Sequence, residues 1–306
     1  MRIRVLGSAA GGGFPQWNCG CPNCQGARDG TAPVEPRTQE SVAISTDDSG
    51  WFLLNASPEI RQQIESFTGL HPRAPRHSPI HAIVLTNGDL DHVLGLLSLR
   101  ESHPLVVYAT RSVRDGFTEG NALYRTLERF PGQVTWRILE LGREQPLAGA
   151  SGDAGPLSIE AVPVPGKLPI HLERRAAPSP EDNIGLCIRE AATGRRLAYF
   201  PAAGGVTPAV RRALDGADLV FFDGTFWSND ELPAQGLGAK RAGDMAHLPV
   251  GGADGTLAAL RGLAAPRRIF IHVNNSNPVL REDSPERKEV AAAGWEIARD
   301  AMEVIV

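Results

Sequence analysis

Two short segments of the 306-residue sequence concentrate side chains that can bind metal ions. The first is Cys19-Gly-Cys-Pro-Asn-Cys24, in which three thiols fall within six residues. Thiolates are soft ligands that hold Zn(II) tetrahedrally at about 2.3 Å, and Gly20 and Pro22 favour the tight turns that aim several sulfurs at one ion. The alternative is a set of three buried free thiols. The spacing predicts a structural zinc at Cys19, Cys21 and Cys24, with a fourth ligand from elsewhere in the chain.

The second segment is Thr86-Asn-Gly-Asp-Leu-Asp-His92, which lies between an apolar run at 82–86 and another at 93–97. The pattern predicts a strand, a short polar loop and the start of a helix, which is where active sites collect in α/β proteins. Asp89, Asp91 and His92 could converge there on one cation. The alternative is that Asp91 only caps the helix and that His92 is a bystander in its first turn.

Alternating and apolar runs, helix caps and turn residues define the elements that must position these segments. Strands are predicted at 3–6, 41–45, 51–54, 82–86, 105–109, 134–139, 157–162, 184–188, 196–200, 219–222, 268–272 and 302–306. Helices are predicted near 57–67, 93–101, 110–119, 122–130, 208–214, 250–262 and 284–292, and long loops at 16–39 and 163–183. This order favours an α/β protein with two sheets between helical layers.

Composition narrows the class of protein. Hydrophobic residues make up 42% of the chain, which predicts a well-buried core. A formal net charge of -4 argues against a nucleic-acid partner. We expect no signal peptide and no membrane span, because no apolar run is long enough. Clustered cysteines are typical of a reducing compartment, so we expect a cytoplasmic protein; Cys187, in a predicted strand, is interpreted as a packing residue.

Three motifs together resemble a known family. The 86–92 loop resembles the H-x-H-x-D-H loop of the metallo-β-lactamase superfamily, and the strand ending at His272 resembles the one bearing its last metal-binding histidine. With Gly-Ser-Ala-Ala-Gly-Gly-Gly-Phe-Pro-Gln-Trp-Asn-Cys-Gly-Cys at 7–21 and Ile-His-Val-Asn-Asn-Ser-Asn-Pro at 271–278, the chain is identified as a member of the pyrroloquinoline quinone (PQQ) biosynthesis protein B family. The resemblance implies an αββα sandwich of the metallo-β-lactamase type, as one domain over 1–306 with a zinc-binding cysteine loop at about 16–30.

The chain departs from the hydrolase pattern of that superfamily at several ligand positions. Asn87 and Asp89 stand where the first two histidines would be, and Ala202 stands where the metal-bridging aspartate would be. His171 lies in the stretch of the middle histidine, with an exposed loop histidine as the alternative. A dinuclear hydrolase needs two filled sites, so ordinary β-lactamase or phosphodiesterase chemistry is not expected.

The remaining set is His92 and His272 with one or both of Asp89 and Asp91. Two imidazoles and a carboxylate with open positions suit Fe(II) and oxygen activation. The resemblance implies a role in making PQQ from a Glu–Tyr cross-linked peptide. Our leading hypothesis is therefore an Fe(II)- and O2-dependent hydroxylase of its tyrosine ring. The alternative is a non-catalytic carrier of PQQ or a late intermediate, with transport to the periplasm.

Three further residues are candidates for the site. Asp223, at the end of a predicted strand, could be a ligand or a hydrogen-bond acceptor, or simply part of a turn. His247 could donate to substrate or orient a ligand, or cap the following helix. By the resemblance, Asn275 stands where related phosphodiesterases place the histidine that completes the cysteine zinc site. His272 or another residue could be the fourth zinc ligand instead. If His272 binds that zinc, it is no longer available to the iron set.

The expected partners follow from the resemblance. The substrate, a peptide-derived PQQ precursor, carries several carboxylates and would need cations such as Lys167, Arg37 or Arg76, although each could equally be a solvated surface charge. Other proteins of the PQQ pathway and a second copy of the chain, as a homodimer, are possible partners.

Overall fold

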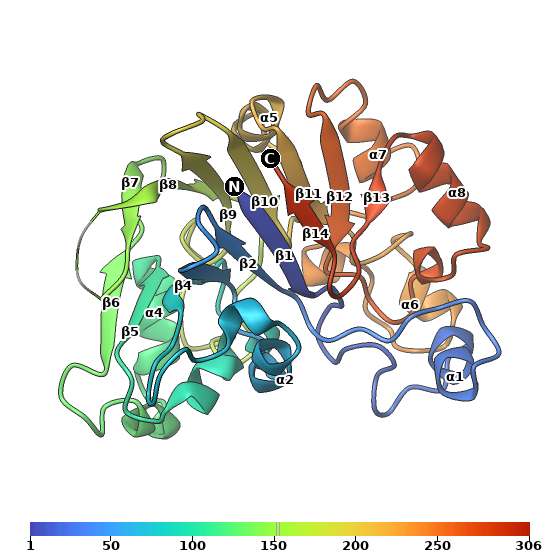
Figure 1. Cartoon of the computed structure of the whole chain (residues 1–306). Coiled ribbons are helices and arrows are strands. Elements are labelled where there is room, and N and C mark those ends of the chain that lie inside the picture. Colours follow the sequence, from blue (N-terminus) through green and yellow to red (C-terminus); the bar gives the residue numbers. More distant parts are fainter. Residues whose placement is uncertain (151, 153) are drawn as a thin grey trace.

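The computed structural model describes residues 1–150, 152 and 154–306. Two seven-stranded sheets lie face to face (Figure 1). The strands of the first sheet, in spatial order, are β14 (Glu303–Ile305), β1 (Arg2–Gly7), β2 (Ser41–Ser45), β3 (Trp51–Leu54), β4 (Ile80–Val84), β5 (Leu105–Ala109) and β6 (Val134–Ile138). Those of the second are β13 (Glu296–Ile297), β12 (Arg267–Ile271), β11 (Leu219–Asp223), β10 (Arg196–Phe200), β9 (Ile184–Glu190), β8 (Ala154–Pro163) and β7 (Glu144–Ala148).

Both sheets are mixed. In the first, β14, β1, β2 and β3 pair antiparallel, whereas β3 to β6 run parallel. In the second, β10 to β13 run parallel, whereas β7 to β10 pair antiparallel. Parallel strands are usually covered on both faces, and their sequences are correspondingly apolar throughout; Leu219–Phe222 is fully buried.

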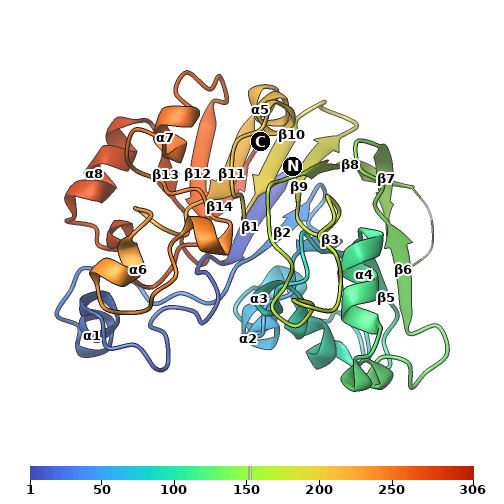
Figure 2. The same cartoon turned by 180° about the vertical axis from the view of Figure 1, so that it is seen from behind.

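Helices cover the outer face of each sheet (Figures 1 and 2). Their bounds are α1 (Pro22–Asp29), α2 (Ile60–Glu65), α3 (Leu90–Val93), α4 (Arg111–Thr118), α5 (Pro208–Asp215), α6 (Glu231–Ala234), α7 (Thr256–Ala259) and α8 (Pro285–Ala292). Short 3₁₀ turns span Thr68–Leu70, Leu94–Leu99, Ala122–Thr126, Gly243–Met245 and Pro278–Leu280. One apolar cluster fills the space between the sheets and two others lie under the helices. The predicted αββα sandwich is confirmed.

Local sequence explains where the elements differ from our predictions. The predicted loop at 16–39 contains α1, because the Cys21 side chain accepts a hydrogen bond from the Cys24 N–H and Pro22 suits the first helical position. The predicted helix at 250–262 is reduced to the four residues of α7. Gly251, Gly252 and Gly255 interrupt its first turns, and Gly252 has a φ of 85°. The short edge strands β7 and β13 were not predicted.

The fold brings the ends of several strands to one edge. The 86–92 segment follows β4, Asp223 ends β11, and His272 follows β12. The Ala9–Val273 bridge joins the loop after β1 to the loop after β12, so the two sheets meet at this edge. None of the helices in the described part of the chain has the length and hydropathy needed to cross a membrane.

A substitution at Phe221 tests how much the packing between the two sheets contributes to the stability of the fold. Its ring is fully buried and contacts the Tyr199 ring with centroids 6.3 Å apart. We expect Phe221→Ala to lower the free energy of unfolding by about 3–5 kcal/mol through lost burial and a residual cavity. Ile305→Ala, on an edge strand where the side chain is 80% exposed, should change it by less than about 0.5 kcal/mol. Urea unfolding of both variants measures the difference; equal losses would contradict the packing described.

Candidate metal centre

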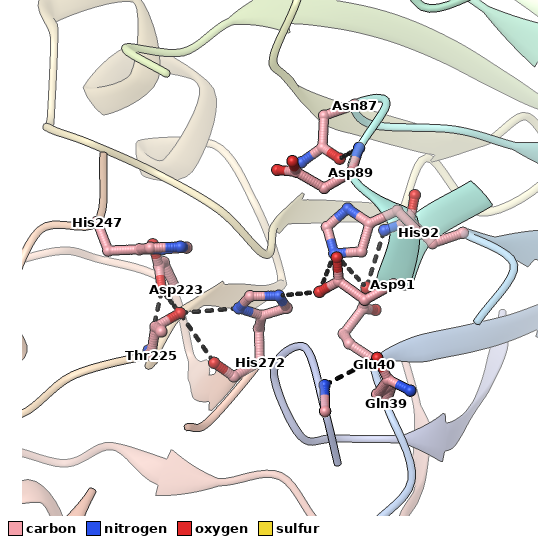
Figure 3. Close-up of polar contacts among 12 residues, drawn as sticks. Gln39, Glu40, Asn87, Asp89, Asp91, His92, Asp223, Thr225, His247 and His272 are labelled. Atoms are coloured by element: carbon pink, nitrogen blue, oxygen red, sulfur yellow. Dashed lines mark hydrogen bonds and ion pairs between the residues drawn. The ribbon is translucent and has the colours of Figure 1, made fainter. Parts of the chain in front are cut away.

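Asp91, His92 and His272 come together at the edge where the sheets meet (Figure 3). One ligand atom from each lies within 4.8 Å of the others. His272 Nε2 lies 3.0 Å from Asp91 Oδ2, and His92 Nε2 lies 3.8 Å from the same oxygen. The two imidazole rings meet edge to face with centroids 5.2 Å apart. The structure therefore joins three of the four residues predicted for the iron set.

A threonine fixes the tautomer of His92. The Thr86 N–H donates to Asn55 Oδ1 at 2.9 Å, so this amide oxygen is an acceptor, and the Thr86 hydroxyl at 3.1 Å must donate to it. That hydroxyl then accepts from His92 Nδ1, 3.3 Å away. His92 Nε2 is left with a lone pair and has no hydrogen-bond partner among the described residues.

Thr225 does the same for His272. Its hydroxyl lies 2.6 Å from Asp223 Oδ1 and 2.9 Å from the His272 carbonyl oxygen, both of which can only accept. It therefore accepts from His272 Nδ1 at 2.8 Å. Such hydrogen bonds to the far nitrogen are how proteins orient metal-binding histidines. Thr86 and Thr225 lie beside acidic residues that were predicted for the site, but no sequence pattern indicates the role of either threonine.

Electrostatics at the three groups follow from burial and mutual charge. Burial lowers the pKa of His92 to about 4. Burial would also lower the pKa of His272, but the hydrogen bond and charge of Asp91 raise it to about 9. Burial opposes ionisation of Asp91, yet the neighbouring His92 and His272 hold its pKa well below the usual range. Without a metal, a proton on His272 therefore occupies the space between its Nε2 and Asp91.

Glu40 is a site residue that sequence reasoning missed. It directly precedes β2, its side chain is 0% exposed, and its Oε2 lies 3.6 Å from His92 Nε2 (Figure 3). Asn55 Nδ2 donates to that oxygen at 2.8 Å, and burial raises the pKa of Glu40 to about 8. No signal in the sequence links residue 40 to residue 92, because only the pairing of β2 within the sheet brings them together.

Asp223 and His247 form a second arm of the site. His247 Nδ1 lies 2.6 Å from Asp223 Oδ2, which also accepts from the Ala203 N–H at 2.7 Å. Burial works against ionisation, but His247 lowers the pKa of Asp223, so Nδ1 of His247 donates to this carboxylate. The His247 ring stacks on that of His272 with centroids 5.5 Å apart. Asp223, His247 and His272 thus form a second potential ligand group that shares His272.

Asp89 lies apart from these groups. Its side chain is 33% exposed and its Oδ1 is 3.7 Å from Lys167 Nζ. His171 lies in the loop between β8 and β9, outside the potential ligand groups of the described residues. Of the predicted substrate cations, only Lys167 borders the site. Arg37 is buried and donates to the Ala298 carbonyl oxygen, so it is a structural residue and that expectation was wrong.

The three clustered cysteines also come together. Their sulfur atoms lie within 4.8 Å of one another around the start of α1. Burial opposes ionisation of all buried thiols, yet hydrogen bonds from Cys24 and Cys19 lower the pKa of Cys21, whereas burial raises that of Cys24. Asn23 Nδ2 donates to the carbonyl oxygens of Asn275 and Asn277 at 3.1 and 3.0 Å. These bonds fasten the loop after β12 onto α1.

Asn275 lies beside this cluster. Its Nδ2 donates to Cys19 Sγ at 3.1 Å, to Cys21 Sγ at 3.7 Å and to Cys24 Sγ at 3.4 Å. The side-chain amide therefore faces all three sulfurs. His272 faces Asp91 instead, so it does not compete for this position.

Backbone strain marks the same region. His272 has a φ of 60° and Asn55 a φ of 62°, although neither is glycine and both are buried. Such conformations cost of order 1–3 kcal/mol and cluster at functional sites. At His272 the strained backbone turns the ring away from β12 and toward Asp91.

Comparisons with known proteins place the chain in a family. A beta-lactamase superfamily domain matches residues 50–273. The coenzyme PQQ synthesis protein B of Azotobacter vinelandii is 44% identical over 306 residues, covering 99% of both chains. The corresponding protein of Cupriavidus necator is 46% identical over 99% of this chain and 98% of its own.

Solved structures extend the comparison. The Zn(2+)-bound PqqB from Methylobacterium extorquens is 41% identical, covers 100% of both chains and superposes with a TM-score of 0.92. A diphosphatase of the PhnP family is 20% identical, covers 100% of this chain and 97% of its own, and has a TM-score of 0.67. At that identity the second similarity concerns the fold alone.

The raised pKa of His272 predicts a pH dependence of stability for protein kept free of metal. The contribution of His272 is complete below its unfolded pKa of 6.5 and is lost as pH rises through about 9. The raised pKa of Glu40 acts in the same direction, since its contribution is lost as pH rises from 4.5 through about 8. We therefore expect the free energy of unfolding, from urea titrations, to fall between pH 6.5 and 9.5. Asp91→Asn should flatten this slope; an unchanged slope would contradict the Asp91–His272 pairing.

Proposed function

Because the chain belongs to the coenzyme PQQ synthesis protein B family of the metallo-β-lactamase superfamily, we propose that it is an Fe(II)- and O2-dependent hydroxylase. Its role in PQQ biosynthesis follows from the family. The proposed substrate is the tyrosine ring of a Glu–Tyr cross-linked, peptide-derived precursor. The proposed iron ligands are Asp91, His92 and His272, with Asp89 as a further candidate beside them.

One observation carries the proposal: the Nε2 atoms of two buried imidazoles face one carboxylate. Both Nδ1–H groups are directed at threonine hydroxyls, so Nε2 is the nitrogen of each ring that faces Asp91. A bound metal would replace the proton that His272 Nε2 directs at Asp91 in the metal-free protein. A divalent cation satisfies all three groups at once. Two histidines and one carboxylate with open positions are the donor set of non-haem Fe(II) oxygenases, and bound iron would supply the activation of O2.

The same residues disfavour a dinuclear hydrolase. Ala202 offers no bridging carboxylate, and the nearby Asp223 uses both oxygens for hydrogen bonds with Thr225, Ala203 and His247. Generation of a bridging hydroxide requires two metals held by such a bridge. A mononuclear redox site fits the available donors better.

Neighbouring residues suit a phenolic substrate. Asp223 fixes the Nδ1–H of His247, so Nε2 of this histidine can accept the phenolic proton as a general base. Lys167, whose ammonium is one-third exposed at the rim, can pair with a substrate carboxylate. Each hydroxylation consumes one O2 and two electrons from an external reductant, and releases water.

His92→Ala tests the iron site. We expect anaerobically loaded wild-type protein to bind about one Fe(II) per chain in addition to zinc, and the variant to lose that iron together with substrate hydroxylation in the presence of O2 and ascorbate. His77→Ala, which changes an exposed histidine, serves as the matched control. Metal analysis and mass spectrometry of the product provide the readout. A His92→Ala protein with full activity, or a wild type that binds no second metal, would contradict the proposal, and the latter would favour a carrier of PQQ.

We also propose a structural zinc at Cys19, Cys21 and Cys24 with the Asn275 side-chain oxygen as the fourth ligand. The amide atom that faces the sulfurs stands where that ligand belongs, and rotation of the amide by 180° exchanges its nitrogen and oxygen. Zinc bound there would hold the loop after β12, and with it His272, against α1.

Cys21→Ser and Asn275→Ala test the structural zinc. Because the binding free energy of such a zinc is folding free energy, we expect Cys21→Ser to lose one zinc per chain and to lower Tm by about 10 °C or more. Asn275→Ala should weaken zinc retention with a smaller loss of Tm. Cys187→Ser, in β9, should leave the zinc content unchanged. Metal analysis measures the zinc content and calorimetry measures Tm. A zinc-free Cys21→Ser protein of wild-type Tm would rule out a structural role for the zinc.

A further inference from the structure

Glu40 faces the metal centre from the β2 side. Its carboxylate is fully buried, and no lysine or arginine in the described ranges pairs with it. Oε2 accepts one hydrogen bond, from Asn55, whereas Oε1 has no partner among the described residues. A buried carboxylate in this situation costs several kcal/mol unless a cation or a proton compensates it.

A second buried polar atom without a hydrogen-bond partner among the described residues lies close to Glu40 Oε2. His92 Nε2 lies 3.6 Å away and has a lone pair directed at the same space, because its only proton is held by Thr86. Two buried acceptors that face one another need a proton or a cation between them, and a metal ion would supply the cation. Ligand atoms bound to one ion at about 2.1 Å are separated by about 3.0–3.5 Å, depending on the geometry. The observed separation is close to that spacing.

We propose that Glu40 is a fourth protein ligand of the metal held by Asp91, His92 and His272. This inference rests on the proposed metal site and extends its donor set to two imidazoles and two carboxylates. One carboxylate would leave a divalent ion with a net charge of +1 in a buried pocket, whereas two neutralise it. A second hard oxygen donor also favours Fe(II) over softer competitors for the site, such as Zn(II) and Cu(II).

The surrounding network keeps Glu40 in place. The Thr86 N–H fixes the orientation of the Asn55 amide, so Nδ2 of Asn55 points at Glu40 Oε2. Asn55 also reaches the Tyr199 hydroxyl at 3.4 Å, and its backbone is held at a φ of 62°. A side chain needed only as the acceptor for Asn55 could be an uncharged glutamine, so this network does not explain the carboxylate.

Glu40→Gln tests the assignment, because it preserves volume and the hydrogen bond from Asn55 but removes the charge. We expect the Kd for Fe(II), from anaerobic titration of the full chain with zinc in the cysteine site, to rise about 100-fold. The preference for Fe(II) over Zn(II) should fall with it. Glu59→Gln is the matched control, since Glu59 is a nearby carboxylate that bonds to Gln39 and not to the histidines. The zinc of the cysteine cluster and Tm report that the fold is intact.

The outcomes separate this proposal from the one it rests on. Wild-type Fe(II) affinity in Glu40→Gln, with loss of iron in His92→Ala, would overturn the role of Glu40 and leave the metal site standing. Absence of a second metal in the wild type would overturn both. Should Glu40→Gln fail to fold, X-ray diffraction from the wild type loaded with Co(II) decides instead. A Glu40 oxygen within about 2.3 Å of the ion is expected, and a distance beyond about 3 Å would overturn the assignment.

Discussion

The site depends on two threonine hydroxyls that can give their proton in only one direction. Thr86 must donate to Asn55, and Thr225 must donate to an oxygen of Asp223 or of the His272 backbone. Both hydroxyls are therefore acceptors toward the histidines, and both imidazoles keep their protons on Nδ1. The Nε2 atoms consequently face inward, where the acidic side chains are. Without this constraint either ring could present Nδ1 instead, and the two Nε2 atoms would not both be available to one cation.

The fold determines where the site residues lie relative to one another. Residues 86–92 follow β4 of one sheet, and Asp223 and His272 end strands of the other, so the site exists only where the two sheets meet. The Asn275 amide lies three residues beyond His272 and touches all three cysteine sulfurs. The position of His272 is thus coupled to the cysteine cluster. The residues next to His272 in the sequence do not indicate this coupling. The strained backbone conformation of His272 is maintained by the hydrogen bonds of His272 with Thr225 and by the contact of Asn275 with the cysteine sulfurs.

Much of this arrangement could be predicted from sequence because it is local. Apolar runs located most strands, and the cysteine spacing located the sulfur cluster, since Cys19, Cys21 and Cys24 are positioned by one turn and the start of α1. Asp91 and His92 were recognisable because they follow a strand and open a helix. Glu40, Asn55 and Thr225 could not be assigned roles, because each acts through a partner far away in the sequence. Thr86 lies only six residues from His92, but the direction of its hydrogen bond is set by the distant Asn55. Arg37 was misjudged for the same reason: whether a cation is at the surface depends on packing that a lone residue does not reveal.

The departures from the hydrolase pattern are connected to one another in space. Asn87, at the position of a superfamily histidine, donates to Asn183 Oδ1 at 3.2 Å, and Asn183 Nδ2 donates to the carbonyl oxygen of Ala202 at 3.1 Å. By resemblance to the hydrolases of the superfamily, Ala202 stands where they have the bridging aspartate. An amide bridge therefore joins two of the altered positions. The segment between β8 and β9 extends beyond the sheets toward α3 and α4 (Figure 2), where Pro169 lies close to Gly88 and Lys167 pairs with Asp89.

Through these contacts the altered residues together anchor the segment between β8 and β9. Histidines and a carboxylate at the same places would bring charge and metal affinity to the base of that segment, whereas amides and a methyl group let it pack there. In the proposed site, the absence of the hydrolase donors and the anchoring of the segment therefore go together. Asp91, His92 and His272, the proposed ligands on the opposite side, take no part in these contacts. A threonine holds each of the two imidazoles, and the carboxylates of Glu40 and Asp91 lie beside them, so a set of donors for one cation is still present.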